Sequence, residues 1–405
     1  MFKKDISHSG FTTDAVSLPP VLKWTSNLGY YSDSSPIVVD GILYVGSNYG
    51  IHALDASSGR ELWTYHTNGF VKSVPSVAGG VLYIGADDRR FYAINAKNGS
   101  LMWIYVNATD GFLSSPAVAG SRVYVGSKDG TLYAFDIQTG GPVWTSLTGR
   151  NIESSPAVLD GTVYFGNDKG SITALDAENG KEKWNYDTGV GMIISSPAVA
   201  NGLVVTGSTD GSIYALAANK SVLKWKYSTG GNVESSPSVT DGIVYAGSND
   251  GNLYAIDFMT GKLRWIYTAG GLIDSSPAIS NDIVYFGSGN NFIYALDANT
   301  GRLLWRNSTG QNEKDYITSP AISGNMLYAV THNGIVYAYS SSAQATPTAT
   351  PAATPAVKET AAVPTATPSA SATVTVTPAG TPKAPGFEYT VLILLVTVLI
   401  RKRLR

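Results

Sequence analysis

Cysteine is absent from the 405 residues of this chain. Its absence excludes disulfide bonds, zinc sites built on cysteine and a catalytic thiol. Charged residues are scarce as well, at 14%, and the formal net charge is only −2. Binding of nucleic acid requires a basic face, which this composition does not offer, so we expect no nucleic-acid partner. From residue 21 to residue 340 the chain also lacks apolar residues at helical spacing, which argues against a helical fold.

The chain does have a strong period. Its eight tryptophans follow one another at steps of 39 to 41 residues, at Trp24, Trp63, Trp103, Trp144, Trp184, Trp225, Trp265 and Trp305. Prolines, mostly preceded by serine, recur in the same phase at Pro36, Pro75, Pro116, Pro156, Pro197, Pro237, Pro277 and Pro320. A fixed period near 40 residues indicates an array of one repeated supersecondary unit.

The segment Ser236–Trp265 shows what that unit is. It contains four short runs rich in Val, Ile and Tyr, as half-buried strands are, separated by three turns. Asp241-Gly242 and Asp250-Gly251 are dipeptides typical of tight hairpin turns, and Thr260-Gly261 marks the third turn. Four strands per repeat are typical of a β-propeller blade, which must stack against other blades to bury both its faces.

The phases of the two markers predict how the ring closes. Trp24 precedes the first proline marker, whereas the last repeat ends at Ser340 with no tryptophan after it. We therefore predict an all-β fold at residues 21–340, a monomeric eight-bladed β-propeller of four-stranded antiparallel blades. The final blade is completed by Val21–Ser26, which pairs with the strand around Val336–Tyr339. This closure leaves no open sheet edge.

Each tryptophan falls on the fourth strand of its unit, and seven of them follow an alanine by ten residues. We interpret all eight as structural anchors that dock one blade against the next. The alternative is an exposed indole ring that stacks a ligand. A residue required at the same place in every blade favours the structural interpretation.

The segments Ala134–Trp144 and Ala255–Trp265 share the pattern Ala-x-Asp-x-x-Thr-Gly-x-x-x-Trp. This pattern resembles the tryptophan-docking motif of the PQQ-like propeller repeat, a family that includes quinoprotein alcohol dehydrogenases and the outer-membrane assembly factor BamB. The resemblance covers residues 5–340, with a lead-in segment at residues 1–20. Only the fifth blade departs from it, with Ala217 and Ser221 in place of Asp and Gly.

For an enzyme of this family, the resemblance implies a tryptophan floor under the quinone, calcium ligands and a vicinal disulfide. The chain has no cysteine, its tryptophans all belong to the repeat, and its short repeats leave little loop for chemistry. The four histidines, His8, His52, His66 and His332, show no metal-ligand spacing. We therefore expect no cofactor, no metal site and no catalysis.

Residues that vary between blades are the candidates for binding. The position three before each proline holds Asp33, Lys72, Leu113, Glu153, Ile194, Glu234, Asp274 and Ile317, where the chain enters the innermost strand. Aromatic residues stand just upstream, at Tyr30, Tyr31, Phe70, Phe112 and Tyr316. We predict that these aromatic residues, with the carboxylates and Lys72, form a partner-binding surface at the mouth of the channel. Alternatively, they are ordinary variable loop residues that partly cover the channel.

After Ser340 the composition changes abruptly. Residues 341–385 are rich in Thr, Pro and Ala, which predicts a disordered stalk because too little apolar surface is present to fold. In residues 386–405 a short apolar stretch, Tyr389–Ile400, precedes a basic end. As a helix its twelve residues rise about 18 Å, less than the roughly 30 Å of a bilayer core.

Together with Pro385-Gly386-Phe387, this layout resembles the archaeal PGF-CTERM sorting signal, which is cut and replaced by a lipid. The resemblance implies an extracellular propeller anchored to the archaeal membrane. Export also requires an N-terminal signal, which Met1–Ser17 does not show, so we expect the natural start to lie upstream. A cytoplasmic propeller with a tail anchor is the alternative.

These observations predict a non-catalytic scaffold, anchored at the cell surface, that binds protein or surface polysaccharide. The alternative is a degenerate quinoprotein or a glycan-active propeller enzyme that binds PQQ or a metal ion.

Overall fold

The structure is a computed structural model that describes residues 8, 10–310 and 315–341. Within these residues every regular element is a β-strand, and no helix long and apolar enough to cross a membrane is found among them. The predicted stalk and the C-terminal apolar helix lie outside the described residues.

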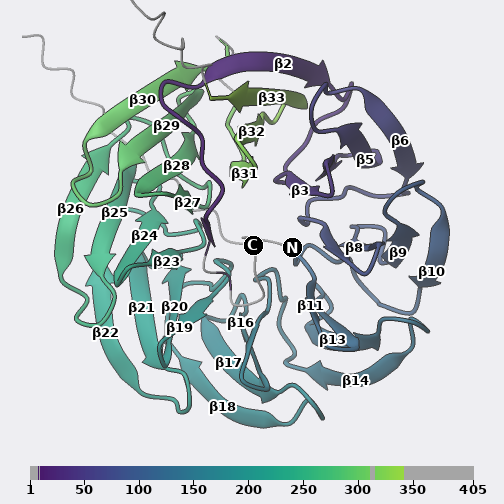
Figure 1. Cartoon of the computed structure of the whole chain (residues 1–405). Coiled ribbons are helices and arrows are strands. Elements are labelled where there is room, and N and C mark those ends of the chain that lie inside the picture. The colour runs from purple at the N-terminus through teal and green to yellow at the C-terminus, as the bar shows by residue number, and fades with distance from the viewer. Residues whose placement is uncertain (1–7, 9, 311–314, 342–405) are drawn as a thin grey trace, which may run out of the picture. The chain divides into compact units, whose positions relative to one another are not determined.

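Eight four-stranded blades surround a central channel, which confirms the predicted fold class (Figure 1). The innermost strands are β3 (Ile37–Val39), β7 (Ser76–Ala78), β11 (Ala117–Ala119), β15 (Ala157–Leu159), β19 (Ala198–Ala200), β23 (Ser238–Thr240), β27 (Ala278–Ser280) and β31 (Ala321–Ser323). The second strands are β4 (Ile42–Gly46), β8 (Val81–Gly85), β12 (Arg122–Gly126), β16 (Thr162–Gly166), β20 (Leu203–Ser208), β24 (Ile243–Gly247), β28 (Ile283–Ser288) and β32 (Met326–Val330). The third strands are β5 (Gly50–Asp55), β9 (Phe91–Asn95), β13 (Thr131–Asp136), β17 (Ser171–Asp176), β21 (Ser212–Ala217), β25 (Asn252–Asp257), β29 (Phe292–Asp297) and β33 (Ile335–Ser340). The outer strands are β6 (Glu61–His66), β10 (Leu101–Tyr105), β14 (Pro142–Leu147), β18 (Glu182–Asp187), β22 (Leu223–Ser228), β26 (Leu263–Thr268), β30 (Leu303–Ser308) and β2 (Val21–Asn27).

We number the blades 1 to 8 by their innermost strands, from β3 to β31. Blade 8 takes its outer strand from the other end of the chain, because β2 pairs antiparallel with β33, with Trp24 opposite Ala338 (Figure 1). This pairing confirms the predicted closure. The strand extends to Asn27, one residue beyond the predicted end.

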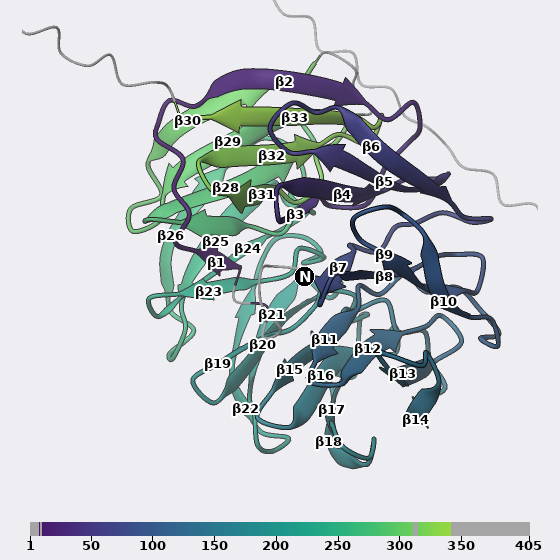
Figure 2. The ribbon, with the colours of Figure 1, turned by 45° about the vertical axis from the view of Figure 1, so that its right-hand side comes forward.

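A strand that the sequence did not predict lies in the channel. β1 (Phe11–Thr12) pairs in parallel with β27 and makes blade 7 five-stranded (Figure 2). Farther along the same segment, the carbonyl of Val16 accepts a hydrogen bond from Tyr285 Oη at 3.3 Å. The lead-in segment therefore crosses from the inner edge of blade 7 to the outer strand of blade 8. Two paired residues are too few to give a recognisable alternating pattern.

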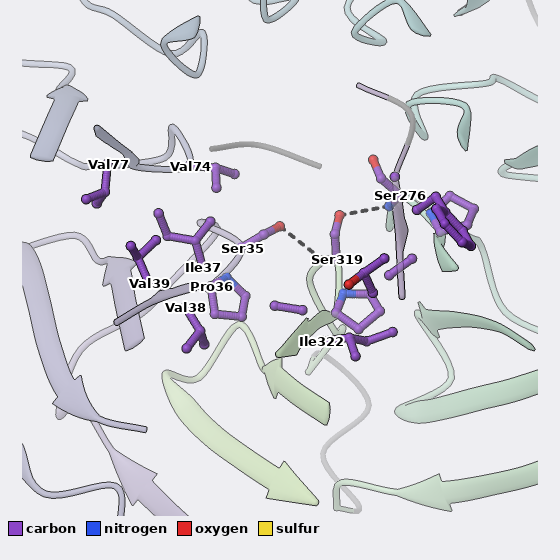
Figure 3. Close-up of a pocket in the computed structure, with 17 residues that line it drawn as sticks. Ser35, Pro36, Ile37, Val38, Val39, Val74, Val77, Ser276, Ser319 and Ile322 are labelled. Carbon is purple, nitrogen blue, oxygen red and sulfur yellow. Dashed lines mark hydrogen bonds between the residues drawn. The ribbon is translucent and has the colours of Figure 1, made fainter. Parts of the chain in front are cut away.

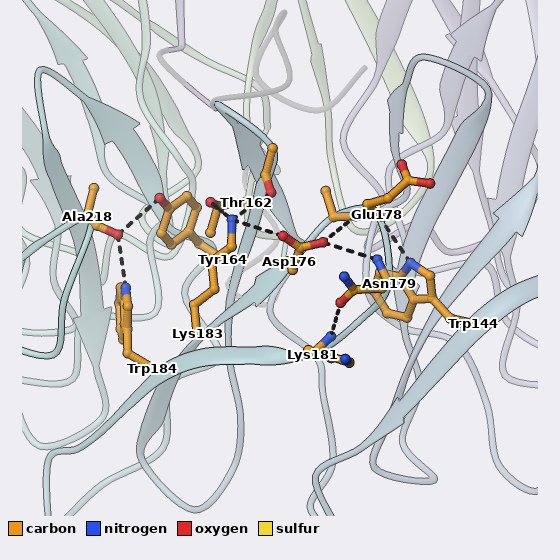
Figure 4. A network of polar contacts seen from close by, with 12 residues as sticks. Trp144, Thr162, Tyr164, Asp176, Glu178, Asn179, Lys181, Lys183, Trp184 and Ala218 are labelled. Atoms are coloured by element: carbon orange, nitrogen blue, oxygen red, sulfur yellow. Dashed lines mark hydrogen bonds and ion pairs between the residues drawn. The ribbon is translucent and has the colours of Figure 1, made fainter.

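Tryptophans join adjacent blades in the same way around the ring. Trp184 of blade 4 donates its indole N–H to the carbonyl of Ala218 in blade 5 at 2.9 Å, and Tyr164 Oη donates to the same oxygen at 3.1 Å (Figure 4). Equivalent indole bonds are made by Trp24, Trp63, Trp103, Trp144, Trp225 and Trp265. The hydrophobic core is accordingly divided into clusters that each lie between two neighbouring blades.

The repeated Ser-Pro also has a structural explanation. The backbone N–H of one blade's serine donates to the hydroxyl of the next, as from Ser276 to Ser319 at 2.8 Å and from Ser319 to Ser35 at 3.1 Å (Figure 3). Six such bonds run around the channel, and a seventh is donated by the backbone N–H of Val74 to the hydroxyl of Ser115. At the remaining junction Val74 stands where the next serine would be. The serine before the proline thus satisfies a buried backbone donor of the preceding blade.

Blade 5 keeps its third turn despite its departure from the repeat motif. The backbone N–H of Ala217 bonds to the carbonyl of Val222 at 2.9 Å, and Ser221 Oγ reaches the carbonyl of Asn185 in blade 4 at 2.6 Å. The serine therefore bonds to the neighbouring blade in place of the missing glycine contact.

Candidate functional site

In a four-stranded blade, the connector from the previous blade and the turn between the second and third strands lie on one face. Backbone hydrogen bonds of 2.9 Å join them, from Asn48 to Tyr31 in blade 1 and from His332 to Tyr316 in blade 8. The same bond defines one equivalent rim position per blade. These rim positions are Tyr31, Phe70, Gly111, Asn151, Met192, Asn232, Leu272 and Tyr316.

The structure exposes some of the predicted aromatic residues and buries another. Tyr31 is 56% exposed and Phe70 is 49% exposed, and Tyr30 is also exposed. Phe112 is 0% exposed and packs against Phe91 with ring centroids 5.6 Å apart, so it is not available to a partner. Tyr316 of blade 8 is half-buried, so the exposed aromatic residues of the predicted set lie on blades 1 and 2 and not on blade 3.

Phe112 is buried because it follows the rim position by one residue. A Cβ atom placed on Gly85 of the second strand would lie 2.3 Å from Phe112 Cβ, so this glycine leaves room for the ring. Val71 lies against Gly46 in the same way, and Ile317 against Gly287. Ile317 is accordingly 3% exposed. It was predicted to be equivalent to Asp33 and Lys72 because it stands three residues before its proline, but it is buried instead.

Asp33 is the centre of a polar network at the channel mouth. Its carboxylate accepts hydrogen bonds from Tyr316 Oη and from His332 Nδ1, the latter at 2.7 Å, and Lys72 Nζ lies 3.5 Å away. His332 is stacked between Tyr31 and Tyr316, with ring centroids 5.1 and 4.7 Å apart. Sequence reasoning placed four of these five residues at the mouth and missed His332, which comes from the turn between β32 and β33.

These contacts determine the charge of Asp33. Burial alone raises the pKa of its carboxyl, but the hydrogen bonds from Tyr316 and His332 and the charge of Lys72 together hold it below the ordinary value. Asp33 therefore remains ionised at neutral pH. Burial and the hydrogen bond to Asp33 raise the pKa of Tyr316, so its phenol stays protonated as a donor.

Beside this network lies a pocket of about 130 Å³, which we call the Asp33 pocket. Its walls are formed by Tyr31, Asp33, Ser47, Asn48, Phe70, Val71, Lys72 and His332. Asn48 also lines it, and the side-chain oxygen of this residue is buried with no hydrogen-bond partner among the described residues. The pocket thus combines aromatic faces, one carboxylate, one ammonium group and the side-chain amide of Asn48.

A second aromatic group adjoins the first on blade 1. Tyr30 is stacked on Tyr49, with ring centroids 4.4 Å apart and planes inclined by only 9°, and Tyr49 meets His66 edge-on. Tyr49 and His66 come from the turn between the second and third strands and from the end of the outer strand, where we made no prediction. The two turn positions that hold Tyr49 and His332 would have been found by comparing this turn across all blades.

The remaining predicted carboxylates, Glu153, Glu234 and Asp274, belong to blades 4, 6 and 7. Burial, followed by the charge of Glu234, raises the pKa of Asp274 to about 6. Burial also raises the pKa of Glu153, against the opposing effect of Lys128 and Lys72. The side chain of Glu234 accepts hydrogen bonds from Asn232 and Asn249 at 3.3 and 3.4 Å. These blades therefore make their part of the mouth acidic, and burial makes the carboxylates of Glu153 and Asp274 costly to ionise.

The channel contains a larger cavity of about 280 Å³ (Figure 3). It is bounded by β1 and by the innermost strands of blades 1, 2, 7 and 8, with Val74, Val77, Ile37 and Ile322 among its walls. The serines that line it already take part in the hydrogen bonds around the ring. It offers apolar surface, and none of the described residues that line it is charged.

The protein is an eight-bladed β-propeller in which a tryptophan of each blade packs against the next blade. The chain belongs to the family described as outer membrane protein assembly factor BamB, whose family model matches residues 22–125, 106–194 and 189–363. No curated protein matches the chain.

Solved structures with the same fold include both assembly factors and enzymes. BamB from Moraxella catarrhalis is 20% identical, with a TM-score of 0.69, over 79% of this chain and 99% of that one. Quinohemoprotein alcohol dehydrogenase from Comamonas testosteroni is 16% identical, with a TM-score of 0.72, over 85% of this chain and 80% of that one. A europium-containing methanol dehydrogenase is 15% identical, with a TM-score of 0.71, over 81% of this chain and 88% of that one. At these identities the likeness shows the fold alone.

A quinone cofactor and its metal ion would need side chains of this chain to hold them. Seven tryptophans are engaged at blade junctions through their indole N–H groups, and Trp305 packs edge-on against Tyr339. In the described part of the chain, no three residues of the His, Asp or Glu type are close enough to hold a metal ion. These side chains do not fit a quinone with its metal ion.

Proposed function

We propose that this protein is a non-catalytic recognition module that binds a partner macromolecule, protein or surface polysaccharide, on the face that carries the channel mouth. The observation that carries the proposal is the group of four exposed aromatic residues Tyr30, Tyr31, Tyr49 and Phe70, which we call the aromatic rim. It spans blades 1 and 2 and borders the Asp33 pocket. Exposed aromatic side chains are the usual anchors of protein and ligand interfaces.

The opposite face supports this assignment by contrast. It carries the turns between first and second strands and between third and fourth strands. Glycine stands in most of these turns, as Asp-Gly in the first turn of blades 1, 4 and 6 and as Thr-Gly in the third turn of blades 3, 6 and 7. In those turns Asp257 and its equivalents bond to the turn's own backbone, as Asp257 Oδ1 does with the N–H of Thr260 at 3.0 Å. Side chains committed to their own turn are less free to bind a partner. Membership in a family described as an assembly factor also favours a scaffold.

We also propose that the propeller is held outside the archaeal cell by a lipid that replaces the C-terminal sorting signal. The apolar stretch Tyr389–Ile400 and the basic end support this proposal. An exposed aromatic face on a cell-surface protein would meet envelope proteins or polysaccharides first.

The test is equilibrium binding of the full chain to envelope preparations from the organism that makes it. We expect Tyr31→Ala with Phe70→Ala to weaken binding at least tenfold, because truncating an aromatic anchor commonly costs about 2 kcal/mol. The matched control is Leu272→Ala, because Leu272 occupies the same rim position in blade 7 and is 42% exposed. The melting temperatures of all variants should agree with that of the wild type.

Two results would contradict the proposal. One is a loss of binding that follows Met259→Ala, an exposed residue of a turn on the opposite face, rather than the aromatic rim. The other is alcohol oxidation by the full chain when PQQ and calcium are supplied with an artificial electron acceptor. That turnover would instead support the alternative of a quinoprotein enzyme.

A further inference from the structure

The Asp33 pocket points to a more specific ligand. We propose that it is a subsite for one uncharged six-membered sugar ring, within a surface polysaccharide or a glycan. This inference rests on the proposed function, because it names the chemistry of the group that the recognition face would bind first.

The size of the pocket fits a single ring. Its volume is about 130 Å³. Protein cavities of about 150 Å³ accept one six-membered ring such as benzene. A pocket of this size is too small for a folded peptide segment, and its open side would allow the rest of a glycan chain to continue along the aromatic rim.

Two flat apolar surfaces border the pocket. Tyr31 is stacked on His332 by one face, at 5.1 Å with planes inclined by 20°, and yet it is 56% exposed. Phe70, from blade 2, stands on the pocket wall and is 49% exposed. The C–H bonds of a sugar ring carry small positive charge, and they pack favourably against the negative face of an aromatic ring. Stacking on His332 holds the exposed face of the Tyr31 ring in place before a ligand binds.

The polar groups in the pocket suit hydroxyl groups, which both donate and accept hydrogen bonds. Lys72 has donors beyond its contact with Asp33 at 3.5 Å. Asn48 also lines the pocket, and a side-chain amide can both donate to and accept from a hydroxyl group. Asp33 is held in place by Tyr316 and His332, so its carboxylate can accept from a further hydroxyl without moving.

The charges around the pocket disfavour ionic ligands of either sign. An anion would face Asp33 within the pocket and Glu153, Glu234 and Asp274 at the same level of the other blades. A cation would meet the ammonium group of Lys72, which already neutralises Asp33. An uncharged ligand with many hydroxyl groups avoids both conflicts. These charges therefore select a neutral sugar rather than an acidic sugar, a phosphate group or a basic peptide.

The experiment is saturation-transfer NMR and calorimetry on the full chain, with the methyl glycosides of glucose, galactose, mannose and N-acetylglucosamine. We expect at least one of them to bind with a Kd in the millimolar range, which is about −4 kcal/mol and reasonable for a single ring. Glucuronate and glucosamine, tested as charged probes, should bind more weakly at low salt.

The variants locate the site. Tyr31→Ala, Phe70→Ala and Asp33→Asn should each weaken the binding of that glycoside about tenfold or more. Leu272→Ala should not change it. Phe70 is exposed and its removal leaves the Asp33 network intact, so this variant keeps the test valid if Asp33→Asn impairs folding.

Failure of this inference can be distinguished from failure of the proposed function. If no neutral glycoside binds, or if the rim variants do not weaken its binding, the sugar subsite is refuted. If envelope binding nevertheless depends on Tyr31 and Phe70, the proposed recognition face remains supported although the sugar subsite is refuted. A lysine-rich peptide that binds the pocket more tightly than any glycoside would also overturn the sugar assignment, in favour of a protein partner.

Discussion

Glycine at the third turn of six blades shows how single residues hold the ring together. A Cβ atom on Gly140 would lie 2.5 Å from Trp103 of the preceding blade, and the same close approach occurs between Gly180 and Trp144. The turn also needs a positive φ, which is 71° at Gly140. The Thr-Gly of the repeat is therefore part of the tryptophan junction as well as of the turn.

This double requirement gives a prediction with a matched control. Gly140→Ala should destabilise the propeller by about 1–3 kcal/mol more than Gly149→Ala, because overpacking a filled site costs that much. Gly149 has nearly the same φ, 72°, but nothing lies within 4 Å of its added Cβ atom. The difference between the two variants in urea unfolding isolates the clash with Trp103. Equal stabilities would mean that the junction is looser than it appears.

Asp274 gives a prediction on pH. Its pKa is raised to about 6 in the folded protein by burial and by Glu234, from an ordinary value of 3.8. The folded state therefore binds the proton more tightly than the unfolded state, and stability falls as the pH rises from about 4 to about 6. Asp274→Asn should remove this penalty and stabilise the protein at pH 7 by about 1 kcal/mol, a value reduced because solvent reaches the side chain.

The control for this prediction has the opposite sign. Arg264 and Thr260 lower the pKa of Asp257 to about 2, so ionised Asp257 contributes stability above pH 4 that is lost as the pH falls toward 2. Asp257→Asn should therefore destabilise the protein at pH 7. Urea unfolding of both variants at pH 4 and pH 7 is the measurement. A gain for Asp274→Asn that is the same at both pH values would contradict the argument.

The candidate site was only partly predictable, and Phe70 and Phe112 show why. Both are phenylalanines in a connector, but Phe70 stands five residues before its proline and Phe112 four. That shift of one residue moves the ring from the exposed rim to the core. The sequence shows the aromatic character of a connector, whereas burial depends on which residue lies against the glycine of the second strand. His332 was missed because its role depends on a turn 16 residues after Tyr316.

At the level of strands, the sequence predicted those elements that repeat. The period, the proline and the tryptophan recur eight times, so the strand pattern and the offset that closes blade 8 follow from them. β1 occurs once, has two residues and pairs in parallel, and nothing in the repeat indicates it. The position of β1 is determined by its pairing with β27 of blade 7, which is a contact between distant parts of the chain.

Closure by β2 gives a prediction at this scale. Deletion of residues 1–26 removes the pairing of β2 with β33, from Val21–Ser340 to Ser26–Val336, and exposes the edge of β33. We expect a melting temperature lower by on the order of 10 °C, and aggregation through the open edge. Thermal unfolding and light scattering measure the two effects.

Deletion of residues 1–17 is the matched control. It removes β1 and Val16 but leaves β2 and the closure in place. We expect a smaller loss of stability and no aggregation. A synthetic peptide of residues 18–28 should restore solubility to the larger deletion by occupying the edge of β33. If both deletions behave alike, the stability of the ring does not depend on β2.

At the scale of the whole chain, the C-terminal segment would determine where the propeller is held. Residues 342–405 lie outside the described residues, and their proposed role rests on sequence alone. An apolar stretch of twelve residues rises about 18 Å as a helix and is too short for a bilayer core of about 30 Å. If it does not serve as a permanent span, a covalent lipid would have to supply the anchorage.

We therefore predict that the protein made by its own organism is cut near Pro385-Gly386-Phe387. Intact-mass spectrometry of the membrane fraction should show a chain that lacks Arg401–Arg405 and carries the added mass of a lipid. Replacing Gly386 and Phe387 by alanine should leave the basic end attached, because the signal that the processing enzyme reads is gone. Replacing Pro382 by alanine, just upstream, should leave processing unchanged. A native protein that retains Arg405 would refute processing and leave the short apolar stretch as a weak anchor, while the propeller and its recognition face would be unaffected.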